Sequence, residues 1–148
     1  QARTVSSLPP RQSASIAVGH GTLLIVDDDE LHGRAVAALA RQLGYDAQLL
    51  MSARVALDLL SQGVEVTAIV SDIVMPDMDG AAFARVLAER APRLALVLMS
   101  GFAPDGALAR LPPHTVLLRK PFGRDELQAS LAQALGAATR PAVHAIAL

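Results

Sequence analysis

The chain has 148 residues, is 52% hydrophobic but only 3% aromatic, has no cysteine, and has a formal net charge of -1. This length suits one domain with a sizeable buried core. The missing cysteines exclude disulfide scaffolds, thiolate metal sites and cysteine nucleophiles. The balanced charge favours no direct nucleic-acid binding. A membrane-spanning helix needs about 20 consecutive apolar residues, and no apolar run in this chain approaches that length. The N-terminus also lacks the apolar core of a signal peptide. We therefore expect a soluble, cytoplasmic protein without membrane contact.

Composition changes along the chain predict one ordered domain between two tails. Residues 1–21 are rich in Ser, Pro, Gln and Gly, which is typical of a linker or tail. Residues 22–136 carry regular apolar patterns, and residues 137–148 are expected to form a C-terminal tail. The chain begins with Gln1 instead of Met, which suggests a processed chain or a fragment of a longer protein.

The first half of the domain alternates strand and helix patterns. Residues 23–26 are apolar at every position, which predicts a strand buried on both faces of a parallel sheet. A helix follows, with Val36, Leu39, Ala40 and Leu43 at helical spacing and Gly44 as its stop. Residues 47–51 predict a second strand. Ser52 is expected to cap a helix that ends near residue 63.

The same alternation continues to the end of the domain. Further strands are predicted at residues 67–70, 94–99 and 116–118. Helices are predicted at residues 81–91, 106–111 and 123–135. Five strands alternating with five helices indicate an α/β fold, with a doubly wound parallel sheet covered by helices on both faces.

Polar residues follow the strongest strand patterns. Asp27 and Asp28 come after the first run, Asp72 after the third, Ser100 after the fourth, and Lys120 after the fifth. Open parallel sheets bind ligands outside the carboxyl ends of their strands. We therefore expect three carboxylates, a hydroxyl and an amine to converge at one edge of the sheet.

This constellation predicts phosphoryl chemistry. Three neighbouring carboxylates repel one another unless a cation lies between them, and Mg²⁺ prefers oxygen ligands together with a phosphate oxygen. One carboxylate can attack the phosphoryl group to give an acyl phosphate, with the metal, the ammonium and the hydroxyl stabilising the developing charge. Lys120 is the sole lysine among 13 basic residues, which favours a specific role for its compact ammonium.

Each part has a plainer interpretation when taken alone. Acidic residues after a strand are often solvated charges at a helix N-terminus, which is what we expect of Asp29 and Glu30. A lone Ser100 is more often a turn residue, and a lone lysine is usually on the surface. The combination of all these residues at strand ends is what favours a site.

Four segments resemble the receiver domain of two-component response regulators, over residues 22–136 and in the order typical of that family. They are Leu24-Ile25-Val26-Asp27-Asp28-Asp29-Glu30, Ser71-Asp72-Ile73-Val74-Met75-Pro76-Asp77-Met78-Asp79-Gly80, Leu98-Met99-Ser100-Gly101-Phe102 and Arg119-Lys120-Pro121-Phe122. The resemblance implies a flavodoxin-like strand order 2-1-3-4-5. A flavin binder of that architecture would need a Ser/Thr/Gly-rich phosphate loop after the first strand, where this chain is acidic.

The resemblance also implies roles for individual residues. Asp72 would be phosphorylated, with Lys120 paired to it and Ser100 binding the phosphoryl group. Asp28 would bind Mg²⁺ directly and Asp27 partly through water, while Asp72 and the backbone carbonyl of Val74 would complete the metal site. The peptide bond before Pro121 would be cis. Asp77 and Asp79 would act as turn and helix-cap residues.

Two departures from the family pattern carry expectations of their own. Leu117 stands where many receivers have an aromatic switch residue, so we expect signalling through smaller backbone shifts over residues 103–118. Val74 and Phe102 are apolar neighbours of the acyl phosphate, so attacking water is poorly positioned and self-dephosphorylation should be slow.

The four histidines, at positions 20, 32, 114 and 144, share no close ligand spacing. We expect all four to be solvated and none to be the phosphodonor of a kinase.

Three classes of function compete. The first is a phosphoacceptor that receives its phosphoryl group from a histidine kinase or phosphotransfer protein, either within a hybrid sensor histidine kinase or as a stand-alone regulator. The Ser100-Gly101-Phe102 segment and the leader favour the hybrid kinase. The domain itself would not be a kinase. A magnesium-dependent aspartyl-phosphate phosphatase would need an acid at position 74, which is Val. A phosphorylation-independent interaction module would not need the whole constellation. A homodimer face and core packing explain the apolar last two helices equally well.

Overall fold

The computed structural model describes residues 21–101 and 111–138. Within them, five parallel strands form one sheet in the order β3-β2-β4-β5-β6. The first strand of the described residues, β2, therefore lies second in the sheet, and the expected flavodoxin-like order is confirmed. No helix in these two stretches is long and apolar enough to cross a membrane.

The three central strands are buried along nearly their whole length. They are β2 (Thr22–Val26), β4 (Ala68–Asp72) and β5 (Ala95–Ser100). The edge strands β3 (Asp46–Leu50) and β6 (Val116–Arg119) alternate buried and more exposed positions. A central strand of a doubly wound sheet is covered on both faces, which explains the apolar runs that predicted it.

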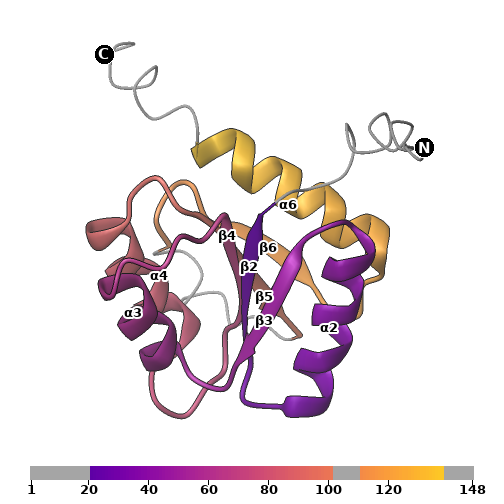
Figure 1. Ribbon diagram of the computed structural model, residues 1–148, viewed down its shortest axis with the longest axis horizontal. Coiled ribbons are helices and arrows are strands. Elements are labelled where there is room, and N and C mark those ends of the chain that lie inside the picture. Colours follow the sequence, from indigo (N-terminus) through magenta and orange to yellow (C-terminus); the bar gives the residue numbers. More distant parts are fainter. Residues whose placement is uncertain (1–20, 102–110, 139–148) are drawn as a thin grey trace, which may run out of the picture.

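Helices cover both faces of the sheet (Figure 1). α2 (Glu30–Gln42) and α6 (Arg124–Ala138) lie on one face, where their buried side chains share a core cluster with Leu23 and Ile25 of β2. α3 (Ala53–Ser61) and α4 (Gly80–Arg90) lie on the other face, where their buried side chains share a second core cluster with Leu24 and Val26. Alternate side chains of one strand thus enter two separate cores, as the two-residue period of a strand requires.

The helix boundaries follow local capping chemistry. Ser52 caps α3 by accepting a hydrogen bond from the Val55 backbone N–H, as predicted. Asp29 caps α2 in the same way through the His32 N–H, and Glu30 in the first turn pairs with Arg34. The predicted helix at residues 106–111 falls almost wholly outside the described residues. α6 extends past residue 136 as far as Ala138.

Candidate functional site

The carboxyl ends of the parallel strands bring the predicted residues to one edge of the sheet. Asp27 directly follows β2, and Asp72 is the last residue of β4. The Cα partner of Asp72 is Met99, so Ser100 lies one residue further along the neighbouring strand. Ser100 in turn is registered with Arg119, the residue before Lys120. Four segments distant in sequence therefore converge, because parallel strands all end on the same side.

Three carboxylates gather within this edge. Asp27, Asp28 and Asp72 each offer an oxygen such that these oxygens all lie within 4.8 Å of one another. Asp27 is wholly buried, Asp72 is 9% exposed, and Asp28 faces solvent. Negative groups this close repel one another, and a bound cation relieves that repulsion. The oxygen-only donor set fits a hard divalent cation such as Mg²⁺.

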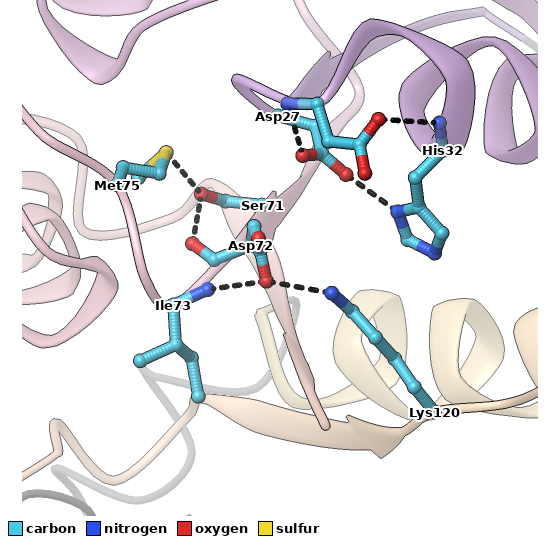
Figure 2. Close-up of polar contacts among 8 residues, drawn as sticks. Asp27, His32, Ser71, Asp72, Ile73, Met75 and Lys120 are labelled. Carbon is cyan, nitrogen blue, oxygen red and sulfur yellow. Dashed lines mark hydrogen bonds and ion pairs between the residues drawn. The ribbon is translucent and has the colours of Figure 1, made fainter. Parts of the chain in front are cut away.

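Lys120 supplies a positive charge beside Asp72 (Figure 2). Its Nζ lies 3.0 Å from Asp72 Oδ1, and the Ile73 backbone N–H donates to the same oxygen at 3.0 Å. The Lys120 backbone N–H donates to the Ser100 carbonyl at 2.8 Å, and the peptide bond before Pro121 is cis. Among the described residues, the contacts of the Asp72 carboxylate therefore fall on Oδ1.

The loop after Asp72 is held by close backbone packing and by two aspartates. The Gly80 N–H donates to the Ile73 carbonyl at 2.6 Å. Asp79 caps α4 through the Ala82 N–H, as predicted for a helix-cap residue. Asp77 instead accepts a hydrogen bond from the Arg54 backbone N–H in the first turn of α3, at 3.1 Å. Asp77 is thus a capping residue of a different helix.

One expectation about the histidines is wrong. The Nδ1 atom of His32 lies 2.5 Å from Oδ2 of the buried Asp27, and its side chain is 30% exposed (Figure 2). His114 is also half-buried and makes an interaction of its own. His20 and His144 lie outside the described residues. Sequence spacing missed His32 because its partner is a carboxylate at a strand end and not a second histidine.

The remaining predicted residues are placed as follows. Ser100 is 7% exposed at the end of β5, while Val74 is 74% exposed in the loop after β4. Leu117 lies on β6 with its side chain 44% exposed. Phe102 lies outside the described residues.

Comparison with known proteins agrees with this geometry. The sequence profile of the response regulator receiver domain matches residues 23–132. The chain is 30% identical over 127 residues to the sensor kinase CckA of Brucella abortus, covering 84% of this chain and 13% of that protein. It is 32% identical over 115 residues to the transcriptional regulatory protein ZraR of Escherichia coli, covering 76% of this chain and 26% of that protein. The chain thus spans a small part of either relative.

Solved structures show the same fold. A response regulator receiver protein from Sinorhizobium medicae superimposes with a TM-score of 0.73 at 27% identity, covering 80% of this chain and 97% of that one. The strand order, the acidic edge with its lysine and the profile match over most of the domain agree with one another. This chain belongs to the receiver domain family of two-component response regulators.

Proposed function

We propose that this domain accepts a phosphoryl group on Asp72 in a magnesium-dependent reaction. Receiver domains of two-component systems interact with histidine kinases or phosphotransfer proteins. A phosphohistidine of such a partner would be the donor, in the cytoplasm. The observation that carries the proposal is the pairing of Asp72 with Lys120 beside two further carboxylates.

The chemistry follows from what each group can supply. An Asp72 oxygen attacks phosphorus, a new O–P bond forms, and the P–N bond to the donor imidazole breaks. Because Oδ1 already accepts from Ile73 and Lys120, Oδ2 is the oxygen left to form the new bond. The Lys120 ammonium offsets charge on the product, and the Ser100 hydroxyl donates to a phosphoryl oxygen.

Asp27, Asp28 and Asp72 would hold the Mg²⁺, with the Val74 carbonyl completing the site. The exposure of Asp28 supports its role as a direct ligand. Both oxygens of the buried Asp27 already accept hydrogen bonds, which supports its action partly through water. When bound, the ion would neutralise the phosphoryl oxygens during transfer.

The test is incubation with a small phosphoryl donor, with and without Mg²⁺, followed by intact mass measurement. We expect the mass to rise by one phosphoryl group only when Mg²⁺ is present, and Asp72→Asn to abolish the rise. Asp79→Asn is the matched control, because asparagine also caps helices and Asp79 lies outside the acidic cluster. A full mass increase in Asp72→Asn would refute the assignment.

The phosphorylated state should be long-lived. Val74, two residues after Asp72, offers no acid or base to direct water at the acyl phosphate. Its exposed side chain leaves room for replacement by Glu. Val74→Glu should shorten the lifetime of the phosphorylated protein, measured by the decay of the phosphorylated mass after donor removal. An unchanged lifetime would contradict this explanation.

We propose that this domain is part of a hybrid sensor histidine kinase. The supporting observation is that the match to the sensor kinase CckA extends over 127 residues, against 115 for the regulator ZraR. The alternative is a stand-alone regulator. Immunoblotting the native protein in its own cells separates them: a band near the 15.4 kDa of this chain would favour the stand-alone form.

At position 117 on β6 this chain has Leu, whereas many receivers have an aromatic switch residue there. Leu117 is 44% exposed on β6, and it has no ring that could move toward a phosphorylated site. We propose that smaller backbone shifts over residues 103–118, of which 103–110 lie outside the described residues, carry the signal. Backbone amide NMR with and without a phosphoryl mimic tests this, and unchanged shifts over these residues would rule it out.

A further inference from the structure

We infer that His32 is a positioning residue for the magnesium site, because its imidazole holds the Asp27 carboxylate in the orientation that metal binding needs. This inference rests on the proposed function. It assigns a role to a residue outside the acidic cluster, and it concerns ion affinity separately from phosphoryl transfer.

The contact between the two side chains has a defined direction. Asp27 is wholly buried, and its Oδ1 accepts a hydrogen bond from the Asp29 backbone N–H at 2.9 Å. Its Oδ2 lies 2.5 Å from His32 Nδ1. An ionised carboxylate can only accept, so the hydrogen between them lies on Nδ1. Because Asp27 is buried, losing one of these donors would leave a carboxylate oxygen without a hydrogen bond that water could replace, which costs free energy.

Contacts of the ring and of its helix turn hold the imidazole in place. The His32 backbone N–H donates to the Asp29 side chain at the start of α2. Gly33 lets this helix turn lie close to β3 and to the end of β2, because a Cβ there would lie 2.4 Å from Leu49 Cδ1 on β3 and 3.3 Å from Asp27 Cβ. On another side, the Phe122 ring meets the imidazole edge to face, with centroids 6.3 Å apart and planes at 84°.

This arrangement connects two strand ends. Asp27 follows β2, while Phe122 follows Lys120 and the cis peptide bond after β6. The His32 imidazole contacts both Asp27 and Phe122. Hydrogen-bond partners of metal-ligating groups orient those groups, and losing one typically costs about 10–100-fold in metal affinity. We expect a loss of this size when the imidazole is removed.

The experiment is a Mg²⁺ titration by isothermal calorimetry at one fixed pH. His32→Leu should weaken Mg²⁺ binding by about 10–100-fold. His32→Asn should restore most of the affinity, because its amide is also a donor of short reach. Leu31→Ala is the matched control on the same helix turn, since Leu31 is 82% exposed and should leave the affinity unchanged. Equal affinity in His32→Leu and wild type, or no rescue by Asn, would overturn the inference.

Two further readouts separate positioning from folding. The NMR shift of the Asp29 amide, which donates to Asp27, should move in His32→Leu and return toward its wild-type position in His32→Asn. If His32→Leu does not fold, Phe122→Leu is used instead, because it keeps the imidazole but removes its contact with the Phe122 ring. This variant should weaken Mg²⁺ binding, by less than the about 10–100-fold expected on loss of the imidazole. Wild-type affinity in Phe122→Leu together with an unmoved Asp29 amide would then overturn the inference.

Failure of the proposed function has a different signature. If the wild-type protein binds no Mg²⁺ and gains no phosphoryl group, both the proposed function and this inference are refuted. If the wild type does both and His32→Leu matches its Mg²⁺ affinity, the inference alone is refuted.

Discussion

Replacing Gly80 by alanine tests how tightly the loop after Asp72 packs on α4. A Cβ at this position would lie 2.7 Å from Ile73 Cα and 3.0 Å from the Asp72 carbonyl oxygen. Both are backbone atoms, so no side-chain rotation can relieve the clash. Alanine favours a helix over glycine by about 1 kcal/mol, whereas overpacking costs about 1–3 kcal/mol. Because the obstruction is backbone, we expect the upper part of the overpacking cost, about 2–3 kcal/mol, and therefore a net loss of about 1–2 kcal/mol in the free energy of unfolding.

The assay is urea unfolding followed by circular dichroism, with Gly136→Ala as the matched control. A Cβ at Gly136 in α6 would meet nothing within 4 Å, so alanine should stabilise the protein there by about 0.5–1 kcal/mol. The two identical substitutions are therefore expected to have opposite signs. If Gly80→Ala is as stable as wild type or more stable, the argument from backbone crowding is refuted.

Three other predictions concern charge and titration. Asp28→Asn removes one of three carboxylates whose oxygens lie within 4.8 Å, so it should stabilise the metal-free protein by about 1 kcal/mol in urea unfolding; a loss of stability would contradict this. Burial raises the pKa of Tyr45, the sole tyrosine in a chain without tryptophan, so its phenolate absorbance should appear only above the ordinary value of 10.0. The contribution of Tyr45 to the free energy of unfolding is then fully present below pH 10.0 and is lost as pH rises through the pKa of the folded protein. A phenolate signal at or below pH 10.0 in the folded protein would refute this prediction. Hydrogen bonds from the Gly123 and Glu126 backbone N–H groups lower the pKa of Glu126. The stability advantage of wild type over Glu126→Gln, measured by thermal unfolding, should therefore persist at neutral pH and shrink as pH falls through the folded pKa; a pH-independent difference would exclude this cause.

Much of the fold follows from local patterns. The runs that became β2, β4 and β5 are apolar because both faces of a central strand are covered, and Ser52 caps α3 through the chemistry of its hydroxyl. The predicted helix at residues 81–91 agrees with α4 to within one residue at each end.

Local patterns also predict several residues of the candidate site. Acidic residues directly after buried runs predicted the gathering of Asp27, Asp28 and Asp72, because parallel strands end on one side of a sheet. Lys120 stood out as the only lysine, and the structure places its ammonium 3.0 Å from Asp72.

Within the described residues, the sequence alone thus determined which strands form, which helices follow them and which carboxylates share an edge, since these depend on periodicity and on strand direction. Tertiary structure decided the contact of His32 with Asp27 and the reach of Asp77 to the first turn of α3. Both depend on how closely one helix approaches a neighbouring strand end or loop. That distance is set by packing between elements, such as the missing side chain at Gly33, which no pattern within a single element encodes.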